Sequence, residues 1–405
     1  KIDHCRGRFC YRRCRYRCIL LWEKPDTMQI IPVASGKGGV GKSLLSANLA
    51  IALGQAGKKV LLADLDLGAS NLHLVLGVPS PATGLGTFLT GNTDFNRIVH
   101  ETSYDNVRFV AGDSEIPGLT SLRAPQKSAL TKQLVSSDAD YLILDLGAGT
   151  HTGILDFFLL SNAGIVVTAP TVTATLNAYL FLKNTVFRMM FTTFKKGSPA
   201  RNWLNDIKND SSSLQRMYIP KVMEEISRID PESAKKFSTR MQAFRPRLVM
   251  NMIDDPKDAD KALKIRRSCK EYLTIELEHL GVIYRDLIQD TALASRLPII
   301  VYKPQSLLSQ AVYRIADKIL QSETEEITDF SSFTDETFQS AEMEASIDFD
   351  SRMNYVEDLI GSGALSMGDL AETIKSQQYE LSVLRRENTL LKHKISQAIQ
   401  QGYRL

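Results

Sequence analysis

The chain has 405 residues, 43% of them apolar, which is enough to bury one large α/β domain with extensions or two smaller domains. Its apolar runs are far shorter than the roughly 20 residues that span a bilayer, so no transmembrane helix is predicted. The formal net charge of +3 at pH 7 hides regions of very different charge.

The first 27 residues form a basic, cysteine-containing segment. Residues 1–27 hold eight Lys or Arg against three Asp or Glu, together with four of the five cysteines. A metal knuckle or basic arm is one interpretation, but the cysteine spacing matches no zinc-ligand pattern. We expect instead that the segment lies outside a fold that begins at Met28. The remaining cysteine, Cys269, lies among charged residues, so no disulfide framework is expected and a reducing cytoplasm fits.

From residue 28 to about residue 320, short apolar runs alternate with amphipathic stretches. After the first run, Leu45, Leu49 and Ala52 recur at helical spacing. Buried-looking strands that alternate with helices predict an α/β fold with a doubly wound, mainly parallel sheet. The runs expected to be strands are 30–34, 60–63, 107–110, 141–144, 165–168, 248–250 and 282–283.

The loop after the first expected strand carries a Walker A phosphate-binding pattern, and a helix is expected after it. Glycines allow backbone N–H groups to converge on phosphates, and the helix N-terminus adds a favourable dipole. Lys42 is expected to reach the β- and γ-phosphates, and the Ser43 hydroxyl to ligate Mg²⁺. The pattern therefore predicts that the chain binds ATP with Mg²⁺. The expected nucleotide-binding residues of the loop are Gly36, Gly38, Gly39, Val40, Gly41, Lys42 and Ser43.

Two further expected strands end in carboxylates. Asp64 and Asp66 follow residues 60–63, and Asp145 follows residues 141–144. Carboxylates at the C-terminal edge of a parallel sheet lie where Mg²⁺ and water must be organised. Four apolar residues followed by Asp read as a Walker B strand, so Asp145 is expected in the Mg²⁺ shell. The alternative is that these are ordinary aspartates at strand ends.

Three regions depart from the strand–helix rhythm. Residues 183–247 are helical in pattern, carry 14 Lys or Arg against 6 Asp or Glu, and are interpreted as an insertion. Residues 321–365 are interpreted as an acidic linker, because residues 321–350 hold ten acidic residues and no basic one. Residues 366–405 are predicted to form a coiled-coil helix with Asn388 at a core position, although a helix packed on its own domain is the alternative. The heptad positions are Leu370, Ile374, Gln377, Leu381, Leu384, Asn388, Leu391, Ile395 and Ala398.

These motifs resemble the MinD/ParA family of P-loop ATPases, whose signature is a KGGVGK[ST] loop and whose fold is of the SIMIBI type. The resemblance covers residues 28–182 and 247–320 and is strongest to the MinD and FlhG (FleN) branch. It implies that Lys37 reaches across a dimer interface onto the nucleotide of the partner protomer, so that ATP binding creates the dimer. The helix after residues 165–168 would face that dimer interface, although Thr171 replaces an acid common in the family.

The resemblance also implies roles for residues at the strand ends. Asp66 would position the attacking water, and Asp64 would support the metal or the loop. Gly147 would sense the γ-phosphate through its backbone, in the run Gly147-Ala148-Gly149 that FlhG-type proteins share closely. Asn251 would read adenine, because an amide can both donate to and accept from an adenine edge. A turn-forming role is the alternative for Asn251.

The expected function is that of an ATPase that hydrolyses ATP slowly, is stimulated by a partner, and positions a division site or a flagellum as a dimeric switch. A ParA-like ATPase that segregates chromosomes or plasmids and binds DNA non-specifically is the alternative, which the basic insertion permits. An iron–sulfur carrier is disfavoured, because it would need paired cysteines in the ATPase domain and only Cys269 lies there. A metabolic kinase is disfavoured, because it would need a second substrate site and the sequence shows no motif for one. A protein partner is expected to bind the C-terminal coiled coil. Association with the inner face of the membrane would be indirect, because anionic lipid repels an acidic linker.

Overall fold

The computed structural model describes residues 28–66, 70–91, 93–112, 122–209, 218–322 and 330–362, together with scattered positions between 368 and 391. The expectation for residues 1–27 therefore lies outside the described residues. The chain divides into two compact units, Lys1–Ser346 and Ile347–Leu405. Among the described residues, no helix is both long and apolar enough to cross a bilayer.

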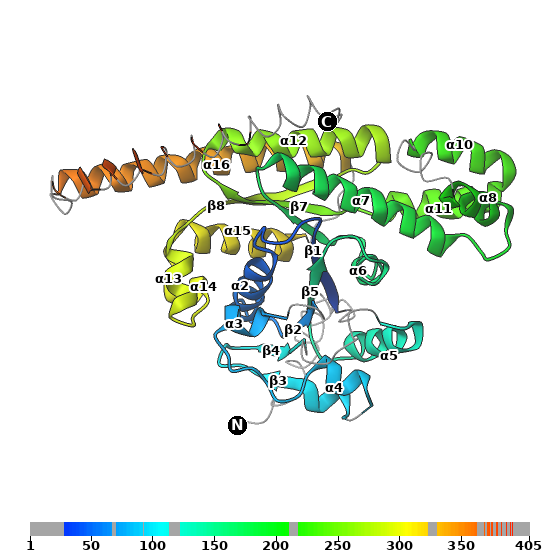
Figure 1. Cartoon of the computed structure of the whole chain (residues 1–405), viewed down its shortest axis with the longest axis horizontal. Helices are drawn as coiled ribbons and strands as arrows, with labels where there is room; N and C mark the ends of the chain where they lie inside the picture. Colours follow the sequence, from blue (N-terminus) through cyan, green and yellow to red (C-terminus); the bar gives the residue numbers. More distant parts are fainter. Residues whose placement is uncertain are drawn as a thin grey trace, which may run out of the picture. The chain divides into compact units, whose positions relative to one another are not determined.

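The first unit is built on an eight-stranded sheet in the order β3-β4-β2-β5-β1-β6-β7-β8 (Figure 1). All neighbouring strands pair in parallel except β3 and β4, which are antiparallel. The predicted doubly wound, mainly parallel sheet is thereby confirmed, and each of the seven expected runs lies in a strand. The strands are β1 (Gln29–Ser35), β2 (Val60–Leu65), β3 (Val99–Glu101), β4 (Val107–Val110), β5 (Tyr141–Ala148), β6 (Ile165–Thr168), β7 (Arg247–Ile253) and β8 (Glu278–Tyr284).

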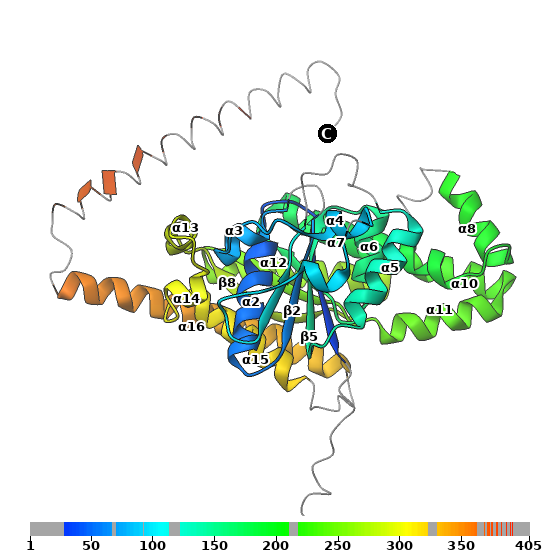
Figure 2. The same ribbon diagram turned by 90° about the horizontal axis from the view of Figure 1, so that it is seen from below.

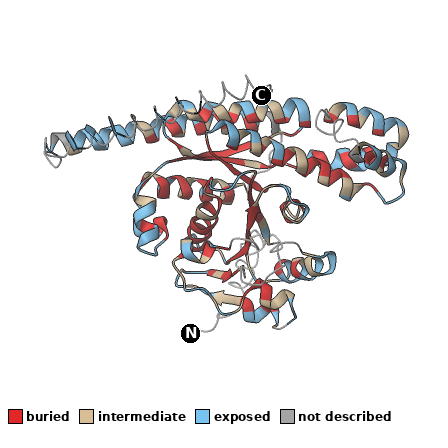
Figure 3. Cartoon of the chain, viewed as in Figure 1, coloured by how far each residue is buried: buried red, intermediate tan, exposed pale blue. Residues whose placement is uncertain are grey.

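Helices cover both faces of this sheet, and the buried residues concentrate along the central strands and the helices beside them (Figure 3). Helices α2, α13, α14 and α15 lie on one face, and α6, α7 and α12 on the other (Figure 1). Parallel strands covered on both faces are expected to be apolar throughout, and β2, β6 and β8 are buried along their whole length. Helix α2 is buried almost all round because α15 covers the side that faces away from the sheet.

The helices of the first unit before α16 are α2 (Lys42–Gln55), α3 (Leu72–Leu76), α4 (Leu85–Leu89), α5 (Ala124–Val135), α6 (Thr152–Phe158), α7 (Val172–Thr193), α8 (Pro199–Asn209), α10 (Ile219–Ile229), α11 (Pro231–Ala243), α12 (Asp260–Ser268), α13 (Ile288–Ala294), α14 (Ile299–Tyr302) and α15 (Leu307–Gln321). Short 3₁₀ segments are η1 (Phe95–Ile98) and η2 (Pro256–Ala259), and a π-helical turn, η3 (Cys269–Leu273), follows α12.

The basic insertion is helical, but its boundary differs from the expected residue 183. Helix α7 runs without a break to Thr193, so the departure from the rhythm begins only after α7 ends. Helices α8, α10 and α11 then lie together beside the end of α7 (Figure 2). Phe194 and Phe237 pack edge to face at 5.9 Å and hold α11 against the end of α7. The sequence pattern of α7 does not distinguish the part of this helix that covers the sheet from the part that extends beyond it, so the boundary was placed too early.

Residues 330–346 do not form the expected solvated linker. They are the first half of a single helix, α16 (Phe330–Gly361). Four residues of this half, Thr334, Phe338, Ala341 and Ala345, are buried at spacings of four, three and four residues. The acidic residues mostly occupy the other positions, so the overall charge of the segment concealed an apolar face.

The first half of α16 covers the outer edge of β8, which is the last strand of the sheet. The His279 backbone N–H donates to Thr337 Oγ1 (3.2 Å), and the Tyr284 hydroxyl donates to the Ala345 carbonyl (2.7 Å). An uncovered edge strand leaves backbone groups free to pair with other chains, and α16 removes that hazard. The rest of α16, from Ile347, belongs to the second unit and is mostly exposed between residues 347 and 359.

The coiled-coil prediction falls largely outside the described residues. Of its heptad positions, Ile374 and Leu391 are described, and both are exposed helical residues. The coiled coil and its partner therefore stay predictions.

Candidate nucleotide-binding site

The predicted phosphate loop lies between the end of β1 and the start of α2. Gly41 immediately precedes α2 with φ 85°, and Gly39 has φ 76°, both in the left-handed region that favours glycine. Gly36 is required for a different reason, because a Cβ there would come within 2.0 Å of the Asn177 carbonyl oxygen of α7. No side chain among the described residues caps α2, so its first N–H groups are free for an anion.

The predicted phosphate and metal ligands converge behind this loop. Lys42 is buried, and its Nζ donates to Asp145 Oδ1 (2.9 Å) and to Ser43 Oγ (3.2 Å). Asp145 ends the run that was expected to be the Walker B strand, and it stands beside the loop because β5 pairs with β1. The structure therefore brings Lys42, Ser43 and Asp145 together. A hydroxyl and a carboxylate are the hard oxygen donors that Mg²⁺ prefers.

Sequence reasoning missed Ser46, which joins the same cluster. Its buried Oγ donates to Asp145 Oδ1 (2.9 Å) and to the Lys42 carbonyl oxygen (3.1 Å). Ser46 lies three residues after Ser43 on α2, so helical spacing alone could have placed it toward the same side. The hydrogen bond from Ser46 holds the carboxylate of Asp145 in place.

Asp64 is a buried carboxylate that organises the loop after β2. Its Oδ1 accepts from the Asp66 N–H (3.0 Å), and its Oδ2 accepts from Ser70 Oγ (2.7 Å) and the Leu72 N–H (3.3 Å). Burial, and next the nearby charge of Asp145, raise the pKa of Asp64 to about 6, against the lowering effect of these hydrogen bonds. The contacts of Asp64 support its expected role toward the loop. A direct metal role stays a prediction.

Asp66 and Gly147 lie side by side at the ends of β2 and β5. A Cβ at position 147 would approach Asp66 Oδ1 to 3.2 Å, which is tighter than ordinary contact. Glycine at this position therefore lets the two strand ends close on one another. The partly exposed Asp66 carboxylate thus stands at the edge of the sheet, near the segment expected to sense the γ-phosphate.

Lys37 points away from this cluster, toward helix α7. It is exposed, and its Nζ donates to Thr173 Oγ1 (3.0 Å) in the first turn of α7. Thr171 caps the same helix, because its Oγ1 accepts from the Ala174 N–H (3.3 Å). The exposed face of α7 beside Lys37 is apolar. Val172 is 82% exposed, and Leu176 and Leu180 follow at helical spacing with 55% and 36% exposure.

Asn251 lies behind the phosphate loop at the end of β7. Its side chain is buried, and its Nδ2 donates to the Val40 carbonyl oxygen (2.9 Å). Its Oδ1 accepts from the Met252 N–H (2.9 Å). The structure therefore brings Asn251 to the loop, while its role as an adenine reader stays a prediction.

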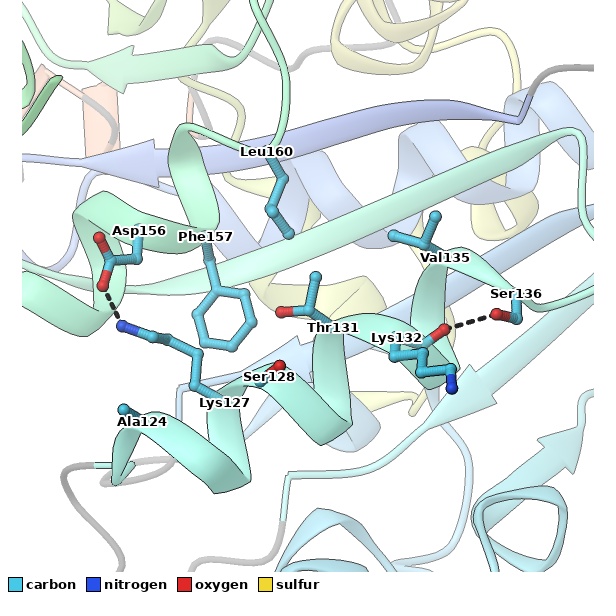
Figure 4. A pocket seen from close by; sticks show the side chains of 10 residues that line it. All are labelled: Ala124, Lys127, Ser128, Thr131, Lys132, Val135, Ser136, Asp156, Phe157 and Leu160. Carbon is cyan, nitrogen blue, oxygen red and sulfur yellow. Dashed lines mark hydrogen bonds and ion pairs between the residues drawn. The ribbon is translucent and has the colours of Figure 1, made fainter. Parts of the chain in front are cut away.

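A shallow groove between α5 and α6 contains none of the predicted site residues (Figure 4). In this groove, Asp156 of α6 forms an ion pair with Lys127 of α5. Asp156 also pairs with Arg188 of α7, which lies outside the groove, and Arg188 Nε is 2.5 Å from Asp156 Oδ1. Hydrogen bonds and the charges of these two cations lower the pKa of Asp156 against the opposing effect of burial, which is the largest single influence. These ion pairs fix α6, the helix that follows Gly147, to both of its neighbours.

Part of the amino-acid sequence is similar to known proteins. Residues 26–186 match the sequence model of a family described as ParA, NUBPL iron-transfer P-loop NTPase. The antiactivator FleN of Pseudomonas aeruginosa is 32% identical over 158 residues, which is 38% of this chain and 56% of FleN. The flagellum site-determining protein YlxH of Helicobacter pylori is 34% identical over 164 residues, 40% of this chain and 55% of YlxH. The matched segments span about half the length of these relatives.

The fold is also found among solved structures. The septum site-determining protein MinD from Pyrococcus horikoshii OT3, complexed with Mg-ADP, superposes with a TM-score of 0.50 and 21% identity. The similarity covers 74% of this chain and 100% of that one. At this identity the likeness concerns the fold alone, which is that of a P-loop NTPase with a mainly parallel sheet.

Proposed function

We propose that the chain is a P-loop NTPase of the ParA/MinD family, to which residues 26–186 are similar, and that it is a dimeric switch driven by ATP binding and slow ATP hydrolysis. The switch would position a cellular structure, either a division site or a flagellum. The observation that carries the proposal is the location of Lys37. This exposed lysine of the phosphate loop lies against Thr173, at the end of the exposed apolar face of α7.

An exposed apolar face beside a nucleotide site favours association with another protein surface. Val172, Leu176 and Leu180 form such a face, and in a symmetric dimer each protomer would present it to the other. Lys37 is the charged group nearest to this face within the loop. A lysine at that place can reach the phosphates of a partner protomer, so that dimer formation and ATP binding become coupled.

The remaining residues would serve the nucleotide of their own protomer. The glycines of the loop and the uncapped start of α2 would bind phosphate oxygens, and Lys42 would transfer its contact from Asp145 to the β- and γ-phosphates. Ser43 and Asp145 would hold Mg²⁺, which supplies positive charge against the phosphates. Because phosphoryl transfer depends mainly on positioning and charge, a site without further catalytic groups hydrolyses ATP slowly.

Release of the switch would involve the two loops that meet at Asp66 and Gly147. Asp66 would orient the attacking water, and the backbone of Gly147 would sense whether a γ-phosphate is present. Asp64 would keep the loop after β2 in place through Ser70 and Leu72. Loss of the γ-phosphate would then relax both loops and the dimer face.

We do not propose iron transfer for this chain, although the description of the matching family model names that activity. Residues 28–320 contain a single cysteine, Cys269. Burial raises the pKa of its thiol to about 12, whereas cluster ligation requires thiolates, several of them together. The donor set of this domain therefore does not suit an iron–sulfur cluster.

Molecular mass in solution tests the proposal. The wild-type protein should be larger with Mg-ATP than with Mg-ADP, and Lys37→Ala should abolish the difference while leaving ATP binding intact. Lys235→Ala removes an exposed lysine of α11 and serves as the matched control that should still dimerise. An ATP-dependent dimer that persists in Lys37→Ala would contradict the role of this lysine.

Two further assays concern the expected docking partners. A ParA-like role predicts that DNA binds at low salt when ATP is present, and it is refuted if DNA fails to bind under those conditions. We also propose that the C-terminal heptads recruit a protein partner instead of lipid. Co-sedimentation with anionic vesicles that depended on residues 370–405 would overturn this part.

A further inference from the structure

Asp145 is a buried carboxylate that accepts two hydrogen bonds on one of its oxygens. It is 1% exposed, and its Oδ1 accepts from Lys42 Nζ and from Ser46 Oγ, both at 2.9 Å. Within the described part of the chain, no other side chain donates to this carboxylate. A buried charge is costly unless it is hydrogen-bonded, so both donors stabilise Asp145 in its ionised form.

The two donors differ in what they do when a nucleotide binds. In the proposed site, Lys42 moves its contact from Asp145 to the phosphates. Ser46 stays in place, because its short side chain is fully buried on α2. Among the described side chains, Ser46 would then be the one that still donates to Asp145.

The Ser46 hydroxyl is suited to compensate for the contact that Lys42 gives up. A hydroxyl carries a single proton, and Ser46 Oγ has two acceptors within reach, Asp145 Oδ1 (2.9 Å) and the Lys42 carbonyl oxygen (3.1 Å). While Lys42 contacts Asp145, either acceptor can take this proton. Once Lys42 has moved, the ionised carboxylate is the stronger acceptor, because charge-assisted hydrogen bonds are stronger than neutral ones.

We propose that Ser46 is a positioning residue, which holds the carboxylate of Asp145 in the orientation that Mg²⁺ requires in the nucleotide-bound state. This inference rests on the proposed nucleotide site. Ser46 lies about one turn of α2 after Ser43, the expected Mg²⁺ ligand of the loop, so the same helix positions both hydroxyls. Residues that orient metal ligands typically account for about 10–100-fold in metal affinity.

The Mg²⁺ dependence of ADP binding separates this role from two others. A residue that only packs α2 would change the ADP affinity equally with and without Mg²⁺. A residue that only compensates Asp145 for the loss of Lys42 would matter more without Mg²⁺, because no metal charge then faces the carboxylate. A residue that orients Asp145 toward the metal matters more with Mg²⁺.

The experiment is calorimetric titration of the full chain with ADP, once in saturating Mg²⁺ and once in EDTA. Ser46→Ala removes the donor, and Ser46→Thr keeps a hydroxyl at the same position. Thr185→Val is the matched control. Thr185 is also a fully buried helical residue whose hydroxyl donates to the carbonyl four residues earlier, that of Phe181 (2.9 Å), but it lies in α7 instead of α2.

Ser46→Ala should lower the ADP affinity about tenfold with Mg²⁺ and by no more than about twofold in EDTA. Ser46→Thr should stay within about twofold of the wild type in both conditions, and Thr185→Val should match the wild type. Equal losses in the two conditions, or a larger loss in EDTA, would overturn the inference, and so would equal losses in Ser46→Ala and Ser46→Thr. Failure of the wild type to bind ADP in either condition would instead refute the proposed nucleotide site.

Discussion

Replacing Phe338 with alanine should release the first half of α16 from the edge of β8. The Phe338 ring is 6% exposed, its centroid lies 5.0 Å from that of the His279 ring, and the Arg266 guanidinium stacks on it at 4.8 Å. Deleting a buried phenylalanine side chain costs about 3–5 kcal/mol. We take about 3 kcal/mol, the lower end of that range, because the site between a helix and a sheet edge can partly collapse. At 1.4 kcal/mol per factor of ten, the docking equilibrium should shift about 100-fold.

Hydrogen exchange at a single amide measures this shift. The His279 N–H donates to Thr337 Oγ1 of α16, so it is protected while α16 is docked. Its exchange rate in Phe338→Ala should therefore rise about 100-fold, in proportion to the population of the undocked state. Amides of β7, which pair inside the sheet, provide an internal reference that should not change.

Met343→Ala is the matched control on the same helix. Met343 is 65% exposed, and substitution of an exposed residue changes stability by about 0.5 kcal/mol or less. Its effect on the His279 amide should be no more than about threefold. An unchanged rate in Phe338→Ala, or equal acceleration in both variants, would refute the docking of α16 and restore the interpretation of this segment as a solvated linker.

Three other substitutions or conditions test the electrostatics and the loop geometry. Burial, with a contribution from Lys318, lowers the pKa of His279 to about 3, so α16 docks on a neutral imidazole, and the ring can bind a proton once α16 undocks. Hydrogen exchange of the His279 amide, corrected for the intrinsic rate, should therefore accelerate about tenfold per pH unit below 6.5. The variant His279→Gln should lose this pH dependence. Because the pKa of Asp64 is raised to about 6, protonation below that pH should weaken Mg-ADP binding by about tenfold per unit in calorimetry, whereas Asp64→Asn should give a flat profile. Gly36→Ala should lower the free energy of unfolding by about 1–3 kcal/mol because the loop must move away from α7, while Gly38→Ala, whose Cβ would have no contact closer than 3.9 Å, should leave thermal melting nearly unchanged.

The central sheet and the phosphate loop could be predicted because their sequence signals are local. The short apolar runs 60–63, 141–144 and 248–250 are each followed directly by a polar residue of the candidate site, Asp64, Asp145 or Asn251, so strand and site positions coincide. Strand β3 escaped detection because it has three residues, only one of them apolar, and pairs antiparallel at the outer edge. A strand that short carries no periodicity to recognise.

Other features depend on contacts between distant segments. The acidic composition of residues 321–350 favoured a linker, but the burial of Phe338 arises from the free edge of β8, about 60 residues earlier. The left-handed backbone of Met252 has no signal in the sequence either, and it lies beside Asn251, whose hydrogen bond to the Val40 carbonyl joins segments more than 200 residues apart. The three hydrogen bonds that Asp64 accepts from its own loop likewise depend on how that loop folds back, which the sequence does not show.

If Lys37 acts on the nucleotide of the partner protomer, two inactive variants should complement one another. Lys37→Ala lacks the lysine that it would offer to its partner, and Asp66→Ala lacks the acid proposed to orient water in its own site. In a heterodimer, the site of the Lys37→Ala protomer keeps its own Asp66 and receives Lys37 from the other protomer. Each heterodimer has one complete site of two, so an equal mixture should recover about a quarter of the wild-type ATPase rate if pairing is random, and up to about half if Lys37→Ala protomers pair only with Asp66→Ala protomers. A mixture that stays as inactive as either variant alone would contradict a cross-protomer role for Lys37.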